Sequence, residues 1–223
     1  MHSALACAEI DLTAIAHNIR ELRRVTRPEA GFMAVIKANA YGHGAVEIAR
    51  VAVEEKADWL GVANVREGLA LRKAGITLPV LIFGYTPPSL VRAVREWGLT
   101  PSVFSLEMAQ RFSEHLARRG TPLGIHVKVD TGMGRLGFPL TGDPADHEKA
   151  LSDLRVMAAL SNLHIQGLYT HFADADATDP AYTQTQLSRF TRFLEDLRAS
   201  GIHPDLAHSA NSAALLRFPE THL

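Results

Sequence analysis

Lys37 directly follows an apolar stretch, residues 32–36, that is typical of a strand buried on both faces. A lysine at the edge of a core costs free energy unless its amine is used. Beside other cations in a buried setting, such an amine loses its proton more readily and becomes a nucleophile. Lys37 is therefore a candidate for covalent chemistry. The alternative is a lysine at a strand end that extends into water.

A glycine-rich segment follows a second apolar strand and reads Asp130-Thr131-Gly132-Met133-Gly134-Arg135-Leu136-Gly137. Its glycines match the G-x-G-x-x-G pattern of dinucleotide-binding proteins, but the residues after it do not begin a helix, so that interpretation is rejected. An arginine is always charged and has donors in a fixed geometry. Arg135 therefore suits an anionic oxygen of a cofactor or a substrate carboxylate.

Two more strand ends carry polar residues. His171 is placed to touch a cofactor ring or relay hydrogen bonds, although a lone histidine there is more often structural. Asn211 and Ser212 open a helix whose free N–H groups suit a phosphate, with simple N-capping as the alternative. The aspartates after His171 lack the glycine and the distal glutamate of a calcium loop, so no metal site is predicted.

Strand and helix patterns alternate along the chain and predict parallel β-α units. Seven core strands are expected, at 32–36, 59–63, 79–83, 101–104, 123–129, 165–169 and 205–207, with helices between them. A (β/α)8 TIM-type barrel is the natural closure, with its site at the carboxyl ends of the strands. A doubly wound open sheet is the alternative. The expected barrel lacks its eighth strand because the chain stops early.

Composition limits the classes of function. The chain has 223 residues, 47% of them hydrophobic, and a formal net charge of -1. No basic stripe suggests nucleic acid or an anionic membrane, and no apolar run has the length of a membrane span. The single cysteine, Cys7, excludes an internal disulfide and fits a reducing compartment. We expect a cytoplasmic protein.

The segment from Ala34 to Gly44, Ala-Val-Ile-Lys-Ala-Asn-Ala-Tyr-Gly-His-Gly, closely resembles the pyridoxal-phosphate lysine motif of alanine racemases. The resemblance recurs in order along almost the whole chain. It implies a fold-type III enzyme that uses pyridoxal 5'-phosphate, which Lys37 holds as a Schiff base. Lys37 also serves as the base on one face of the substrate.

The same resemblance implies roles for the other residues. Tyr41 and Ser212 match the phosphate contacts of the family, and Asn211 belongs to the same phosphate-binding motif. Arg135 matches an arginine that contacts both the cofactor phenolic oxygen and the substrate carboxylate. His171 matches a histidine that packs by the pyridine ring. Two further residues complete the set: His208 matches a family position without an assigned role, and Lys128 matches a lysine that is carbamylated in some members, with an ordinary ion pair as the alternative.

The implied activity is the interconversion of L- and D-alanine, which supplies D-alanine for cell-wall peptidoglycan, by a homodimer. The family draws the base for the other face, a tyrosine, from the second domain of a partner subunit, and no residue here matches it. Residues 1–10 are expected to form a strand that pairs with a missing C-terminal β domain, and residues 11–223 an incomplete cofactor-binding barrel. The chain alone is then weakly active or inactive. The alternative is a single-domain protein that binds pyridoxal phosphate for homeostasis, without catalysis.

Overall fold

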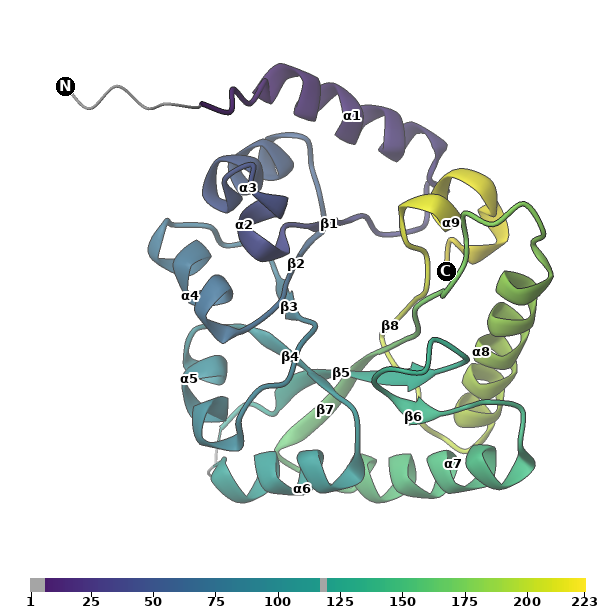
Figure 1. Ribbon diagram of the computed structural model, residues 1–223. Helices are drawn as coiled ribbons and strands as arrows, with labels where there is room; N and C mark the ends of the chain where they lie inside the picture. Colours follow the sequence, from purple (N-terminus) through teal and green to yellow (C-terminus); the bar gives the residue numbers. More distant parts are fainter. Residues whose placement is uncertain (1–6, 117–119) are drawn as a thin grey trace.

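The computed structural model describes residues 7–116 and 120–223. Parallel strands pair in chain order to form a curved sheet, and Figure 1 looks along the axis of that curve. The strands on this path are β1 (Met33–Val35), β2 (Trp59–Val62), β3 (Val80–Ile82), β4 (Thr100–Val103), β5 (Leu123–Asp130), β7 (Leu163–Tyr169) and β8 (Leu206–His208). A two-residue strand, β6 (Phe138–Pro139), pairs with the end of β5. The expected order of parallel strands is confirmed.

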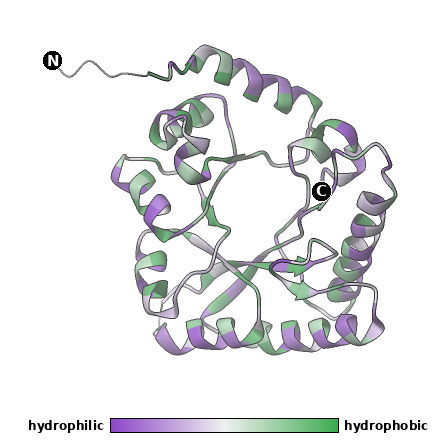
Figure 2. Ribbon diagram, in the orientation of Figure 1, coloured by the Kyte–Doolittle hydropathy of each residue, from purple (hydrophilic) through white to green (hydrophobic). Residues whose placement is uncertain are grey.

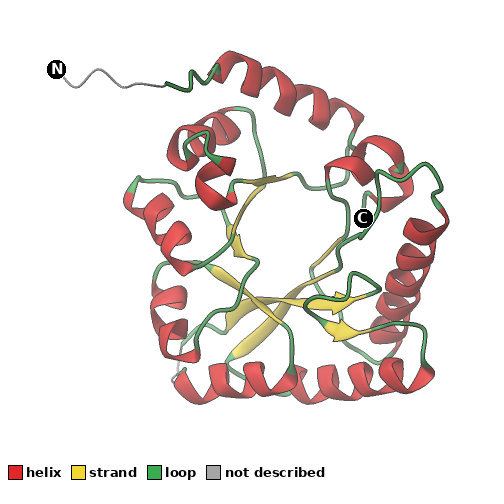
Figure 3. Cartoon of the chain, viewed as in Figure 1, coloured by secondary structure: helices red, strands yellow, loops and turns green. Residues whose placement is uncertain are grey.

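Helices form an outer ring around the strands (Figure 3). They are α1 (Leu12–Val25), α3 (Ala45–Glu54), α4 (Val65–Lys73), η1 (Pro88–Leu90), α5 (Val91–Glu96), α6 (Leu106–His115), α7 (Pro144–Ala158), α8 (Ala181–Ala199), α9 (Ser212–Arg217) and η2 (Pro219–Thr221). Several begin at a side chain that accepts a hydrogen bond from the first turn, as with Asp11, Asn64 and Ser105. Each crossover helix brings the chain back to start the next parallel strand.

The core lies between this helical ring and the sheet. All three residues of β3 are fully buried, and so are Phe112, Phe190 and Phe193 on the inner faces of α6 and α8. Figure 2 shows strands that are largely hydrophobic and helices that alternate between hydrophobic and hydrophilic residues. A sheet covered on its outer face by amphipathic helices produces this pattern.

The sheet is open between β1 and β8. Each pairs on one side only, and the structure describes no strand between them. Val35 in β1 is 39% exposed and Leu206 in β8 is 38% exposed. The incomplete barrel is therefore confirmed. The expectation that residues 32–36 are buried on both faces was wrong for β1, because an edge strand has no neighbour to cover its free side.

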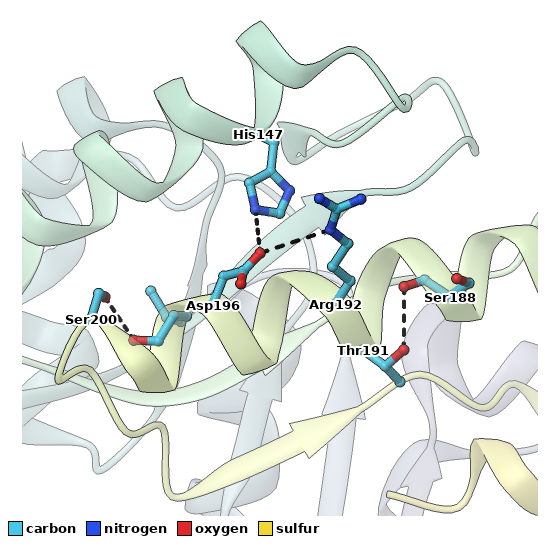
Figure 4. A network of polar contacts seen from close by, with 7 residues as sticks. His147, Ser188, Thr191, Arg192, Asp196 and Ser200 are labelled. Atoms are coloured by element: carbon cyan, nitrogen blue, oxygen red, sulfur yellow. Dashed lines mark hydrogen bonds and ion pairs between the residues drawn. The ribbon is translucent and has the colours of Figure 1, made fainter.

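Helix α7 begins at Pro144, where Asp143 accepts a hydrogen bond from the Ala145 N–H at 2.8 Å. His147 then reaches Asp196 of α8, with 2.9 Å between Nε2 and Oδ2, and joins the two helices (Figure 4).

The strand expected at residues 1–10 is not formed in its described part, residues 7–10. Residues 7–10 form no regular secondary structure, and Ala6 lies outside the described residues. A strand needs a partner for its backbone hydrogen bonds, and the expected partner is a β domain outside this chain. Its pairing stays a prediction. Within the described ranges, no helix has both the length and the apolarity needed to cross a membrane.

Candidate active site

The backbone after β1 turns in the left-handed sense. Ala38, Asn39, Ala40 and Tyr41 have φ angles of 52° to 55°, and they form α2 (Lys37–Tyr41). Left-handed helical backbone costs roughly 1–2 kcal/mol per residue for side chains other than glycine. Without glycine at these four positions, no local residue pattern indicates such a turn.

Two side chains hold the left-handed turn in place. The Glu67 carboxylate of α4 accepts a hydrogen bond from the Ala38 N–H at 3.0 Å and from the Ala63 N–H at 2.7 Å. Asn39 Oδ1 accepts from the Ala45 N–H at 2.9 Å, at the start of α3. The backbone strain next to Lys37 is therefore offset by polar contacts, which is how strained backbone persists at functional sites.

A cavity of about 770 Å³ opens at the carboxyl ends of the strands. All seven residues proposed from the sequence line it: Lys37, Tyr41, Lys128, Arg135, His171, Asn211 and Ser212. The Lys37 Nζ lies 6.0 Å from the centre of the Tyr41 ring. The cavity is large enough for a ligand of the size of a cofactor. The roles of these seven residues toward a ligand stay predictions.

Asp130 organises the glycine-rich loop, residues 130–137. Its Oδ1 accepts hydrogen bonds from the N–H groups of Gly132 and Gly134, each at 3.0 Å, and its Oδ2 accepts from the Arg135 N–H at 2.9 Å. Burial raises the pKa of Asp130, but these hydrogen bonds and one from Met133 outweigh it, so the pKa lies below its usual value. The charged carboxylate thus fixes the backbone that presents Arg135.

Lys128 lies inside the barrel with 5% of its surface exposed. Burial, together with the nearby charges of Arg135 and Lys37, outweighs the opposing effect of Asp130 and lowers the pKa of Lys128 to about 8. Its Nζ lies 5.7 Å from the centre of the Tyr169 ring. Among the described residues, no carboxylate lies within 4.0 Å of its amine.

His171 lies in the loop after β7, residues 170–175, which we call the β7 loop. Burial, followed by the positive charges of Lys128, Arg135 and Lys37, lowers the pKa of His171 to about 4. The imidazole is therefore neutral at neutral pH, and one ring nitrogen is free to accept a hydrogen bond. A neutral ring adds no further positive charge beside three cationic side chains.

The inner wall of the cavity includes a chain of aromatic and polar side chains. Tyr169 is stacked on His208, with ring centres 4.6 Å apart and planes inclined by 4°, and its hydroxyl lies 2.7 Å from Ser102 Oγ. His208 Nε2 lies 3.0 Å from His126 Nδ1. Burial, and then His126, lowers the pKa of His208 well below its usual value, while burial lowers that of His126 to about 4 despite Asp205. Both rings are therefore neutral at neutral pH.

Asn211 and Ser212 stand at the start of α9. Asn211 Oδ1 accepts a hydrogen bond from the Ala214 N–H at 2.9 Å, so its side-chain oxygen is the N-cap. Ser212 is exposed to the cavity. The N-capping alternative thus describes Asn211, and Ser212 keeps its hydroxyl accessible to a ligand.

Four residues that shape this site were given no role from the sequence. Asp130 was readable in principle, since an aspartate before glycines favours a turn that accepts backbone N–H groups. Asn64 and Glu67 have the spacing of a capping box. Gln186, which contacts both site loops, had no signal because it lies in the middle of an ordinary amphipathic helix pattern.

The family model for the N-terminal domain of alanine racemase matches residues 10–223. The chain is 46% identical over 216 residues to an alanine racemase of Methanococcus maripaludis, covering 97% of this chain and 56% of that protein. It is 45% identical to the alanine racemase of Desulforamulus reducens, again over 97% of this chain and 57% of that protein. The chain thus spans about half the length of the curated relatives it matches.

Solved structures agree with these sequence matches. An alanine racemase of Clostridium difficile 630 has a TM-score of 0.90 at 35% identity, over 96% of this chain and 57% of that one. A histidine racemase of Leuconostoc mesenteroides subsp. sake has a TM-score of 0.84 at 31% identity, over 94% and 54%. Proteins named for different amino acids therefore share this barrel.

Proposed function

The chain belongs to the alanine racemase family by its N-terminal domain, and from this premise we propose that the full-length protein interconverts L- and D-alanine with pyridoxal 5'-phosphate. The observation that carries the proposal is the set of donors around one cavity. A primary amine, an arginine, a neutral imidazole and two hydroxyl groups meet there, on the loops that follow parallel strands.

This set of donors fits the chemical groups of the cofactor. The Lys37 amine suits its aldehyde, and the Arg135 guanidinium suits its phenolic oxygen. The hydroxyls of Tyr41 and Ser212 suit its phosphate, with Asn211 shaping the same turn. His171 is neutral and suits the face or edge of its ring. When bound, pyridoxal phosphate withdraws electrons from the substrate α-carbon, which makes its proton easier to remove.

The residues of this chain would then divide the work. Lys37 would move the proton of the α-carbon on one face, and Arg135 would hold the substrate carboxylate. We also propose that Lys128 is carbamylated, since its lowered pKa favours the neutral amine that this reaction needs. The carbamate would carry a negative charge beside Arg135 and orient it.

The face opposite Lys37 needs a second base. We propose that it comes from a partner subunit, in a homodimer of the full-length protein. The chain alone would then bind cofactor poorly and racemise little. We further propose a cytoplasmic location and a role in supplying D-alanine for peptidoglycan. That alanine is the substrate is also part of the proposal, because the barrel alone does not fix the amino acid: a histidine racemase shares it at 31% identity.

The first experiment adds pyridoxal phosphate to the purified chain and to Lys37→Ala. Reduction with borohydride followed by peptide mass spectrometry then reports whether the cofactor is attached, and where. We expect attachment at Lys37 in the wild type, none at this site in the variant, and a visible absorption band with the same dependence.

A racemase assay on the same preparations separates the cofactor site of this chain from its need for a partner subunit. Attachment at Lys37 with little conversion of L-alanine supports both proposals. Normal racemase activity of the chain alone would contradict the need for a partner. No attachment in the wild type means that the cofactor site requires protein beyond these residues. Attachment without racemisation in the full-length protein would instead favour the homeostasis alternative.

A further inference from the structure

One face of α8 contacts the glycine-rich loop at three points. Tyr182, Gln186 and Arg189 are four and three residues apart, so they lie on the same side of the helix. The Tyr182 hydroxyl donates a hydrogen bond to the Gly132 carbonyl at 2.7 Å, and Arg189 Nη1 donates to the Thr131 carbonyl at 2.9 Å. Gln186 lies between these two contacts.

Gln186 also reaches the β7 loop, where Thr183 of the same helix donates a hydrogen bond to the Asp174 carbonyl at 3.3 Å. Its Oε1 accepts a hydrogen bond from the Ala173 N–H at 2.9 Å. Its Nε2 donates to the His171 carbonyl at 3.2 Å and to Thr131 Oγ1 at 3.3 Å. Because the Ala173 N–H can only donate, it fixes which end of the amide is oxygen. One side chain therefore binds both loops that carry the cationic and imidazole groups of the site.

The contact between the loops is buried and continuous. Thr131 Oγ1 lies 2.8 Å from Thr170 Oγ1, and both threonines are buried, as is Gln186 with no exposed surface. A buried amide costs free energy unless both of its ends are hydrogen-bonded, and an apolar residue would fill the same space at less cost. Packing alone therefore does not explain a glutamine here.

The approach of the helix is also close. A Cβ atom at Gly132, where φ is +140°, would lie 2.4 Å from the Tyr182 hydroxyl oxygen. The glycine-rich loop thus lies directly against α8, with no room for a side chain between them. The glycine-rich loop is thus held both by its contacts with α8 and by the Asp130 carboxylate within it.

We propose that Gln186 is a positioning residue: it joins the glycine-rich loop to the β7 loop and so sets how Arg135 and His171 face each other across the cavity. The effect of Gln186 on cofactor binding rests on the function proposed above. The link between the two loops does not, because it consists of hydrogen bonds within this chain. The test therefore measures the loops and the cofactor separately.

Hydrogen exchange of the purified chain tests the joining of the loops. Gln186→Met keeps the length of the side chain but removes all three hydrogen bonds, so amides of both loops should exchange at least about tenfold faster. Gln186→Glu keeps an acceptor for the Ala173 N–H, and the Thr131 hydroxyl can turn and donate to it, but the bond to the His171 carbonyl is lost because that carbonyl can only accept. This variant should therefore loosen the β7 loop at His171 and leave the glycine-rich loop nearly as in the wild type. Gln184→Met, exposed on the same helix, is the matched control and should exchange like the wild type.

Binding of pyridoxal phosphate tests the consequence for the site. We expect Gln186→Met to raise the dissociation constant about tenfold, and to shift the cofactor absorption band relative to wild type and Gln184→Met. Unchanged exchange in either loop of Gln186→Met overturns the proposal. So does an unchanged dissociation constant in a protein whose wild type binds the cofactor. If the wild type binds no cofactor, the proposed function fails for this chain, and the exchange measurement still decides whether Gln186 joins the loops.

A second pair of variants covers the case in which Gln186→Met does not fold. Thr131→Val removes the hydroxyl partner at nearly constant volume, and it can be combined with Gln186→Glu. If the two side chains act together, the double variant should loosen the glycine-rich loop no more than Thr131→Val alone. Faster hydrogen exchange in the glycine-rich loop of the double variant than in that of Thr131→Val would contradict the proposal.

Discussion

Single residues in this cavity depend on their neighbours for their charge. Lys128 is the clearest case, because burial and two nearby cations lower its pKa to about 8. About half of these amines are neutral at pH 8, whereas an exposed lysine is almost entirely charged there. Asp130 shows the reverse, with backbone N–H groups that lower the pKa of its carboxyl group although burial raises it.

The state of Lys128 leads to a prediction about carbon dioxide. The neutral amine attacks the carbon atom, a C–N bond forms, and the nitrogen releases a proton to solvent, which leaves a carbamate. We expect a carbamate signal in 13C NMR of the chain with labelled bicarbonate, increasing from pH 6 to pH 8 as the amine loses its proton. Lys128→Arg keeps a positive charge but cannot form the carbamate. The same signal in that variant would assign it to another amine.

Asp130→Asn tests what holds the glycine-rich loop. The amide oxygen can keep the bonds from Gly132 and Gly134, but its NH2 group cannot accept from the Arg135 N–H. We expect a loss of about 1–2 kcal/mol in the free energy of unfolding, and faster exchange at Arg135. Asp143→Asn is the control, because asparagine is an equally good N-cap. Equal losses in both variants would argue against a special role for Asp130.

At the scale of the element, the left-handed turn α2 depends on contacts from outside itself. Its four residues with positive φ store strain that no local preference explains. Glu67 connects the turn to α4 and to the end of β2, and Asn39 connects it to α3. The turn is thus held by two helices and a strand, and Lys37 is positioned by all three.

Glu67→Gln removes one of the two carboxylate oxygens that accept these N–H groups. We expect the free energy of unfolding to fall by about 1–2 kcal/mol, and the Ala38 or Ala63 amide to lose protection in hydrogen exchange. Reductive attachment of pyridoxal phosphate to Lys37 should become slower. Glu107→Gln, an exposed glutamate in the first turn of α6, is the control. Normal protection at both amides would show that the turn holds itself.

At the scale of the whole molecule, the curved sheet collects polar groups in its interior. His126 lies within β5, His171 in the loop after β7 and His208 at the end of β8, and each has a lowered pKa. Their folded-state pKa values lie below the unfolded value of about 6.5, so the unfolded chain binds more protons between pH 6.5 and about 4. The stability that depends on their neutral forms is complete above pH 6.5 and is lost as the pH falls.

The lowered pKa values of these histidines predict how the free energy of unfolding changes with pH. The free energy of unfolding should fall from pH 7 to pH 5, with His126 alone contributing a slope of at most about 1.4 kcal/mol per pH unit. Denaturant unfolding at several pH values should give a shallower slope for His126→Phe, whatever its stability at pH 7. Gln184→Met replaces an exposed residue that does not titrate and should leave the slope nearly unchanged. A pH-independent free energy of unfolding in the wild type would contradict the neutral, buried histidines.

The sequence by itself determined the order of the parallel strands, the open barrel, and seven of the residues that line the cavity. It could do so because hydrophobic periodicity and turn residues are local signals, and because parallel strands bring their carboxyl ends to one edge. Lys37 and Arg135 were found from their own surroundings in the chain. The family resemblance added the expected partners of each.

Only the tertiary structure decided how these residues are held. The left-handed turn at Ala38 is stabilised by Glu67, which lies 29 positions away in the chain, and the glycine-rich loop is held in part by Gln186. The exposed side of β1 likewise reflects the lack of a second neighbouring strand among the described residues. These features are set by contacts between distant segments, and no local pattern encodes them, because a buried hydrogen bond or an unpaired edge exists only once the chain has folded.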